Sequence, residues 1–272
     1  MSRIKPGITK FIAVARTLFK AQTAYRFDMA MAAVETLGRV LFARILWGVV
    51  FQSRETVGGF TYQRMLAYYV VSSFLVSLET SYSVESELNE RIRGGSFSKY
   101  MVIPTNPIAH FMARTCGSAL YSAMFTSVAA VFGAAAFGAR LTGAVEPGAA
   151  ASAALMIPLG LAFMVCFRFW IGVMAFRFED AGFFIHLEGS VIQFVTGAMV
   201  PLALLPDSVT GALRFLPFHY VTYTPAMLLT GQLSRREGWA GLAILAAWMC
   251  VMLPLAQLTY DRARVRYDGV GA

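Results

Sequence analysis

The sequence predicts an all-α polytopic membrane protein with six transmembrane helices, and three observations lead to this fold class. Hydrophobic residues make up 57% of the 272-residue chain and charged residues only 14%. In soluble domains about a quarter of the residues are charged. Several stretches of the chain run for about 18 residues or more without a charge, which is long enough for a helix to cross a bilayer. Lys and Arg collect between alternate stretches, which is typical of cytoplasmic loops.

The expected spans are Met29–Phe51, Gln63–Tyr82, Thr115–Ala139, Pro147–Phe176, Phe183–Leu205 and Gly238–Tyr260. The third is the clearest, because its 25 residues hold no charge. The second is the least distinct, because only Met65–Leu78 is free of charge. A stretch of that length also suits a buried or re-entrant segment. A single membrane domain, residues 1–272, accounts for the whole chain.

Two segments outside the spans have their own character. In residues 1–28, Lys5–Arg26 has apolar residues at helical spacing with basic residues between them, which predicts an amphipathic helix in the membrane interface. Residues 206–237 are aromatic and apolar but broken by prolines. We expect this segment to form one or two short helices that lie at the outer interface or re-enter it.

The basic residues predict the orientation. If the N-terminus is inside, the inner segments hold 15 of the 23 Lys and Arg residues, counting Arg168 as part of a tight inner turn. This bias places both termini in the cytoplasm. The net charge of +8 therefore indicates topology, and it does not indicate a nucleic-acid partner. The polar segment 83–107, between the second and third spans, then lies in the cytoplasm.

The sequence lacks the motifs of several enzymes. It has no G-x-x-x-x-G-K-[ST] phosphate loop, so we expect no ATP site in this chain. Its three histidines lie far apart and its three cysteines share no ligand spacing, so we expect no metal site and no disulfide framework. No serine lies in a G-x-S-x-G elbow, and we expect no catalytic residues.

Three groups of residues are candidate functional sites. In the segment 83–107, the charged residues Glu85, Glu87, Glu90, Arg91 and Arg93 precede a glycine stop at Gly94-Gly95, which is typical of a helix end. Glu87 and Arg91 are spaced to pair along that helix. The helix either docks a partner or is an ordinary solvated connection.

The second group consists of charged residues at the expected spans, and these are costly to bury in a membrane. Its members are Glu35, Arg39, Arg44, Glu79 and Glu188. Glu35 and Arg39 are spaced to pair. The two arginines of the first span either pair with Glu79 or Glu188 or contact an anionic or amphipathic substrate.

The third group belongs to the outer segment, where a gate over a pathway and simple anchoring in the interface both fit the composition. Its members are Pro201, Pro206, Pro217, Phe218, Tyr223 and Pro225.

Two patterns carry a family resemblance. Ile92–Tyr100, IRGGSFSKY, is followed by Pro104–Pro107, PTNP. This resembles the "I-x-x-G-x-hydrophobic-S-x-Y-L-hydrophobic-x-P-x-x-P" segment of ABC exporter permeases of the second type, with Met101 where Leu is more usual. The stretch from Pro201 to Gly231 resembles that family's "P-hydrophobic-P … L-P-F … Y-x-P … G" outer segment. The resemblance extends over essentially the whole chain and is closest to an uncharacterised branch.

The resemblance implies the permease subunit of an ATP-driven exporter in a bacterial plasma or inner membrane. Two permeases, identical or different, would pair above two cytoplasmic ATP-binding subunits, and ATP and Mg would be cofactors of those subunits alone. The helix Glu85–Arg93 would be the coupling helix seated in the ATPase, and the N-terminal helix would also lie against the ATPase. The first, second and fifth spans would line a substrate path that works by alternating access. A self-contained channel or secondary transporter is the alternative, and a membrane-bound lipid enzyme is a third.

Overall fold

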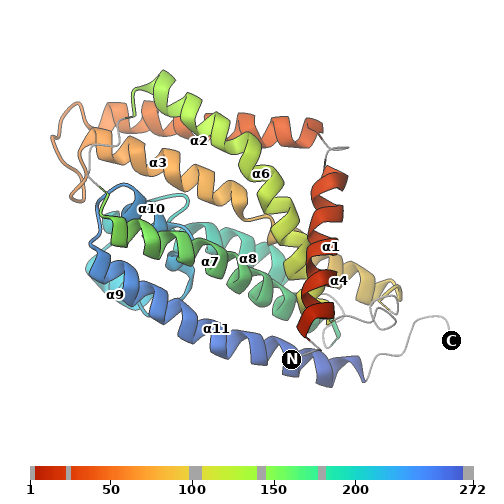
Figure 1. The fold of residues 1–272 in the computed structure, drawn as a ribbon. Helices are drawn as coiled ribbons and strands as arrows, with labels where there is room; N and C mark the ends of the chain where they lie inside the picture. Colours follow the sequence, from red (N-terminus) through yellow and green to blue (C-terminus); the bar gives the residue numbers. More distant parts are fainter. Residues whose placement is uncertain (1–3, 23–25, 98–105, 140–144, 177–181, 266–272) are drawn as a thin grey trace.

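In a computed structural model, the chain is described except for residues 1–3, 23–25, 98–105, 140–144, 177–181 and 266–272. The described part forms α-helices, short 3-10 helices and loops, without a strand. Figure 1 shows long helices that run alternately between two ends of the molecule. They are α2 (Arg26–Val50), α3 (Tyr62–Leu78), α6 (Pro107–Phe137), α7 (Pro147–Val173), α8 (Gly182–Val195) and α11 (Arg235–Arg264).

Three helical segments in the described part are long and apolar enough to cross a membrane: Pro107–Phe137, Pro147–Phe176 and Arg235–Arg264. They correspond to the third, fourth and sixth expected spans. Helix α2 has nearly the expected bounds of the first span, but it carries Glu35, Arg39 and Arg44. The six-span topology and the re-entrant character of residues 206–237 stay predictions.

The expected second and fifth spans are longer than the helices found there. Helix α3 ends at Leu78, where the chain continues into a short 3-10 helix, η2 (Ser81–Ser83). Helix α8 ends at Val195, and the chain turns through Gly197, whose φ of 75° favours glycine. The charge-free stretch Met65–Leu78 ends where α3 ends, whereas apolar residues continue past Val195, so hydropathy does not register the break after α8.

One end of the molecule holds α1 (Ile4–Gln22), α4 (Val84–Arg93) and the C-terminal end of α11 (Figure 1). Helix α1 packs against α6 at a close backbone crossing, where a Cβ on Gly117 would lie 2.3 Å from the carbonyl oxygen of Ala15. Only glycine permits this approach. The expected amphipathic helix is therefore present, and it lies against the helical bundle.

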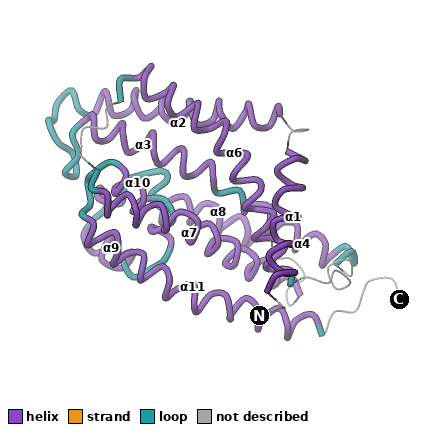
Figure 2. The backbone as a smooth tube through the Cα atoms, viewed as in Figure 1, coloured by secondary structure: helices purple, strands orange, loops and turns teal. Residues whose placement is uncertain are grey.

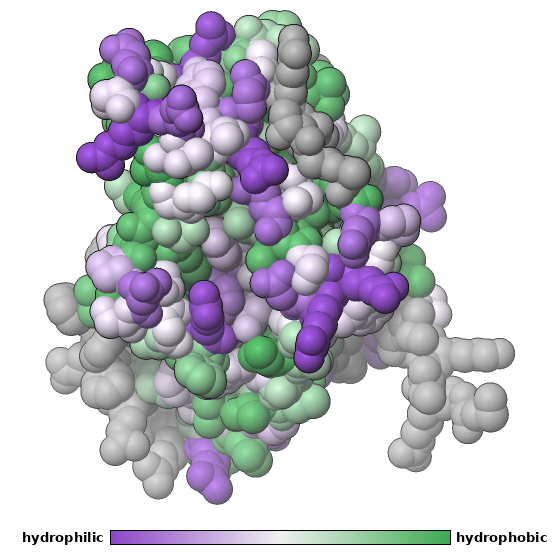
Figure 3. All heavy atoms as spheres, turned by 90° about the vertical axis from the view of Figure 1, so that its left-hand side faces the viewer, coloured by the Kyte–Doolittle hydropathy of each residue, from purple (hydrophilic) through white to green (hydrophobic). Residues whose placement is uncertain are grey.

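The other end holds the loop between α2 and α3 and the predicted outer segment (Figure 2). That segment forms η4 (Leu202–Leu204), α9 (Asp207–Leu213), η5 (Phe218–Tyr220) and α10 (Tyr223–Leu229). Figure 3 looks onto this end, where hydrophilic side chains are spread over the face. Exposed polar residues from 52–56 and 235–237 contribute to this surface.

Local signals explain where the long helices begin and end. Asn106 accepts a hydrogen bond from the Ile108 amide, and Pro107 occupies the first turn of α6. Ser234 and Glu237 form a capping box at the start of α11. Helix α7 contacts α4, α10 and α11 and lies in the largest hydrophobic core cluster. This central position brings the end of α7 against α4.

Candidate functional site

A cavity of about 660 Å³ lies among α2, α3, α7 and α8, and we call it the acidic chamber. Four of the five charged residues predicted for a substrate path line it: Glu35 and Arg39 from α2, Glu79 at the end of α3, and Glu188 from α8. Helices α2 and α3 and the distant α8 thus bring these residues together. They correspond to the first, second and fifth expected spans, which the family resemblance assigned to the path.

Arg168 of α7 also lines the acidic chamber, and its side chain is almost completely buried, at 6% exposure. Its guanidinium lies 3.0 Å from the Glu79 carboxylate and 3.2 Å from that of Glu85 on α4. Its Nε lies 3.5 Å from Oε1 of Glu188. The expectation that Arg168 marks an inner turn is wrong, because α7 continues to Val173 and turns this side chain inward.

The prediction for Glu85 needs a correction as well. Its side chain is 3% exposed and turned toward Arg168, so it is not available on the surface of α4. Burial raises the pKa of the Glu85 carboxyl to about 8; the Arg168 guanidinium opposes this shift, and the carboxylates of Glu188 and Glu79 add to it. The Glu85 carboxyl therefore exchanges its proton much closer to neutral pH than an exposed carboxyl does.

The α2 residues divide into two groups. Arg39 donates to Glu35 at 2.6 Å, so the predicted pairing is confirmed, and Glu35 is 63% exposed. Arg44 does not line the chamber. Its guanidinium contacts α6 instead, at 3.4 Å from the Ala136 carbonyl oxygen and 5.6 Å from the centre of the Phe137 ring. In the described part of the chain, Glu79 and Glu188 pair with Arg168, and neither arginine of α2 is their partner.

Helix α4 has one buried face and one open face. Val84, Glu85, Leu88 and Ile92 are buried, mostly against α7. A Cβ on Gly172 of α7 would lie 3.0 Å from the Glu85 Cα, so the two backbones approach closely here. The predicted glycine stop is confirmed, since the helix ends at Arg93 and Gly95 has a φ of 71°.

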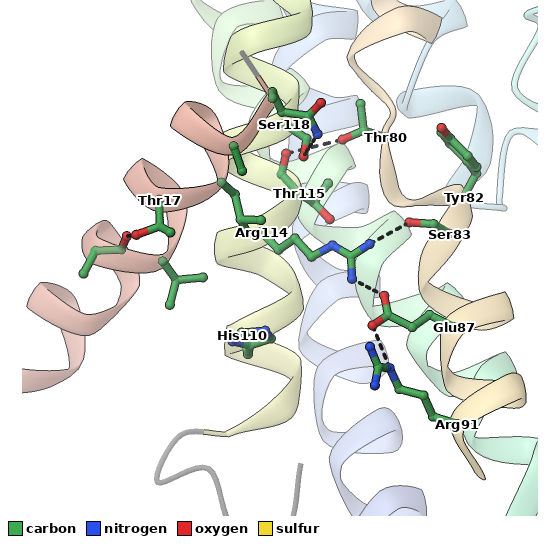
Figure 4. A pocket seen from close by; sticks show the side chains of 15 residues that line it. Thr17, Thr80, Tyr82, Ser83, Glu87, Arg91, His110, Arg114, Thr115 and Ser118 are labelled. Atoms are coloured by element: carbon green, nitrogen blue, oxygen red, sulfur yellow. Dashed lines mark hydrogen bonds and ion pairs between the residues drawn. The ribbon is translucent and has the colours of Figure 1, made fainter. Parts of the chain in front are cut away.

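The open face of α4 is smaller than the sequence suggested. The predicted pair of Glu87 and Arg91 is confirmed, with Arg91 donating at 2.9 Å. Arg114 of α6 also pairs with Glu87 and donates to Ser83, as Figure 4 shows. Glu87 is thus engaged inside the chain. Glu90 and Arg93 are the exposed charges that α4 presents outward.

A second cavity, of about 770 Å³, lies among α1, α4 and α6 (Figure 4). Arg114, Glu87 and Ser83 form its polar wall, and Thr17 and the residues near it on α1 form the opposite wall. The Gln22 side chain donates to the Ser118 hydroxyl at 3.2 Å. This cavity therefore lies between the N-terminal helix and the predicted coupling helix.

The predicted outer-gate residues lie near the broken end of α8. Pro201, Pro206 and Pro217 precede η4, α9 and η5, and Pro225 is buried in α10. The Phe218 ring packs edge-on against two α7 rings, those of Phe163 and Phe167. The prolines thus divide this segment into short helices.

Two tyrosines of α3 and one backbone amide stabilise the break after α8. Tyr68 donates to the Gly197 carbonyl at 2.6 Å, and Tyr69 donates to that of Met199 at 3.0 Å. The Tyr223 amide donates to the Thr196 carbonyl at 3.0 Å. Non-helical backbone in a low-dielectric setting needs such partners. The sequence shows two adjacent tyrosines in α3, but not what they contact.

The fold and the chamber define a class of protein: a helical membrane protein whose buried ionic cluster joins a short polar helix at one end to an internal cavity. A model of the ABC-2 family transporter proteins matches residues 37–271, and the chain belongs to this family. Searches of curated proteins and of solved structures each found no match. The family consists of membrane components of ABC transporters, which work with ATP-binding subunits and are generally not catalytic themselves.

Proposed function

We propose that this chain is the permease subunit of an ATP-driven exporter and forms half of a substrate path that works by alternating access. It pairs with a second permease, different or identical, and with two cytoplasmic ATP-binding subunits that hold ATP and Mg. The setting is a bacterial plasma or inner membrane, crossed six times, with both termini in the cytoplasm.

The observation that carries the proposal is the ionic link between α4 and the acidic chamber. Glu85 on α4 shares Arg168 with Glu79 and Glu188, which line the chamber from α3 and α8. A force on α4 therefore acts directly on the walls of the cavity. An element that docks a partner and a cavity that holds a substrate need this kind of connection.

The mechanism follows from that link. When the ATP-binding subunits close, they push α4, and α7 moves with it because the two backbones are in contact beside Gly172. The chamber then changes the side of the membrane to which it is open. The permease supplies no bond-making chemistry, and transport results from different substrate affinities in the two states.

The orientation rests on the basic residues. Moving Arg168 from the inner loops to the protein interior leaves 14 of 23 Lys and Arg residues on the proposed cytoplasmic side, and six remain on the outer side. The cytoplasmic excess persists, and it is the property that determines the topology of membrane helices.

The test is co-purification of the tagged chain with its ATP-binding subunit in mild detergent. The charge reversals Glu90→Arg and Arg93→Glu alter the exposed face of α4 without touching the cluster around Arg168, so we expect both to reduce the yield of the ATPase several-fold. Glu55→Arg, in the exposed loop between α2 and α3, is the matched control. Reversal of Glu87 is less informative, because it also breaks the contact with Arg114.

Two results would contradict the proposal. An intact, active complex in both α4 variants would show that α4 does not dock the ATPase. Substrate flux through liposomes that contain the purified chain alone would favour the self-contained channel or secondary transporter.

A further inference from the structure

The acidic chamber has an excess of negative charge. Four carboxylates and two guanidinium groups line it: Glu35, Glu79, Glu85, Glu188, Arg39 and Arg168. The pair between Glu35 and Arg39 is neutral as a unit. Around Arg168, three carboxylates share one positive charge. The surplus is two negative charges when all three are ionised, and one when Glu85 is protonated.

Two carboxylate oxygens of this cluster lack a hydrogen-bond partner among the described residues. They are Oε2 of Glu85 and Oε1 of Glu188, and their side chains are 3% and 7% exposed. Both residues line the chamber. Oε1 of Glu188 still has the Arg168 Nε at 3.5 Å, whereas Oε2 of Glu85 has no such contact. A buried carboxylate oxygen without a partner is costly, so the place beside Glu85 Oε2 favours a donor or a positive charge from a bound molecule.

The rest of the lining combines serine and threonine side chains with hydrophobic residues and includes one aromatic ring. Met31, Ile185 and Ile192 contribute hydrophobic surface, and Tyr82 contributes an exposed ring. The volume of about 660 Å³ is in the range of pockets that hold drug-sized molecules. Aromatic rings attract organic cations through their faces.

We propose that the acidic chamber binds amphipathic organic cations, with the cationic group beside the carboxylates that surround Arg168 and the apolar body against the methionine and isoleucine side chains. This inference rests on the proposed function and names its substrate class. It keeps the amphipathic alternative of the expected anionic or amphipathic substrate and replaces the anionic one, which depended on Arg39 and Arg44. Arg39 is paired with Glu35, and Arg44 lies outside the chamber.

Cation binding is linked to protons at this site. The charged groups that act on Glu85 are Arg168 from α7, Glu188 from α8 and Glu79 from the end of α3. With its pKa near 8, Glu85 must release its proton before it offers a full negative charge to a substrate. A bound cation favours that release. Affinity for a permanent cation should therefore increase as the pH rises from 7 to 9.

The experiment uses the complete transporter complex in lipid nanodiscs and ethidium, a permanently cationic, amphipathic fluorophore, as the probe. Fluorescence anisotropy should report saturable binding of ethidium and no saturable binding of fluorescein, an anion of similar size. Affinity should rise up to about tenfold between pH 7 and pH 9, and Glu85→Gln should remove this rise.

Variants separate the cluster from nonspecific uptake into lipid. Glu188→Gln and Glu79→Gln each remove one charge with little change of shape, and each should weaken ethidium binding about tenfold, as loss of one charge–charge contact in a partly buried site implies. Glu55→Gln removes an exposed carboxylate distant from the chamber and should leave the affinity within twofold of the wild type.

Failure of this inference is distinct from failure of the proposed function. If the complex is intact and hydrolyses ATP, but ethidium does not bind saturably or fluorescein binds as well, the substrate class is wrong and the permease assignment stands. Equal affinity in wild type, Glu79→Gln and Glu188→Gln would also overturn the inference. If no ATP-binding subunit accompanies the chain, the proposed function itself fails.

Discussion

The close approach of α4 to α7 leads to a quantitative prediction for Gly172→Ala. The new Cβ would lie 2.8 Å from Leu88 Cβ, 2.9 Å from Leu88 Cδ1 and 3.0 Å from Glu85 Cα. Ordinary carbon contacts are about 3.5–4.0 Å, so the methyl group is too close to three atoms by roughly 0.5–1 Å. One of these is a backbone atom, and rotation of the Leu88 side chain alone cannot remove the clash. Helix α4 must move away from α7.

The expected cost combines two opposing effects. Overpacking a buried contact destabilises by about 1–3 kcal/mol. Replacing glycine by alanine within a helix returns up to about 1 kcal/mol. The net result should be a loss of about 1–2 kcal/mol together with a displaced α4. Coupling should suffer more than stability, because α4 carries both the contact with Arg168 and the proposed docking face.

Three measurements test this prediction. Thermal unfolding of the purified chain should show the loss, hydrogen exchange should be faster in α4, and substrate-stimulated ATP hydrolysis in the complex should fall several-fold. Gly38→Ala is the matched control, since no atom lies within 4 Å of its added Cβ in α2. It should be as stable as the wild type or slightly more so. If Gly172→Ala matches Gly38→Ala in stability and in α4 exchange, the close packing described here is incorrect.

Three further predictions concern other contacts. Gly117→Ala would place a methyl group 2.3 Å from the Ala15 carbonyl oxygen, so α1 should separate from α6 and become sensitive to protease. Unchanged protection of α1 from the protease would count against this packing. Tyr68→Phe leaves the buried carbonyl of Gly197 without its donor, which should lower the free energy of unfolding by about 1–3 kcal/mol, as measured by thermal unfolding. An unchanged free energy of unfolding would mean that this hydrogen bond contributes little. Because the pKa of Glu85 in the folded chain, about 8, exceeds the usual carboxyl value of 4.5, the folded state binds more protons between these values, and stability should decrease as the pH rises through this window. Glu85→Gln should flatten that decrease in the unfolding temperature, and an equally steep profile in the variant would exclude Glu85 as its source.

Much of the helical organisation could be predicted from the sequence, because it depends on local properties. Charge-free runs located α6, α7 and α11, and the helical spacing of opposite charges predicted the pairs of Glu35 with Arg39 and of Glu87 with Arg91. The glycines after Arg93 predicted the end of α4. Each of these inferences needs only residues within a few turns of one another.

The ionic cluster could not be predicted in the same way. Its members belong to four elements, and the contact between Arg168 and Glu85 joins residues 83 positions apart. A count of charges treats an arginine in an apolar stretch as the end of a span. The signal available in the sequence was that Arg168 is the one basic residue within an otherwise uncharged Pro147–Phe176, which is expensive unless acidic partners surround it.

The surface of α4 was overestimated for a related reason. Five charged residues in one short polar segment suggested five contacts for a partner. Helical geometry turns Glu85 toward α7, and Arg114, which is distant in sequence, pairs with Glu87. Only the folded chain shows which charges remain exposed on the helix.

The two tyrosines of α3 link this helix to the break after α8, and the end of the same helix contacts the ionic cluster. Tyr68 and Tyr69 hold the backbone where α8 breaks, and Glu79, at the other end, holds Arg168. Between Tyr68 and Glu79 the chain spans roughly 16 Å of helix, at 1.5 Å for each residue. A straight helix changes its length very little under load, so a displacement at one end is transmitted along its axis to the other. A shift at the ionic cluster would therefore reach the turn after α8 as a push along α3, with little loss of amplitude.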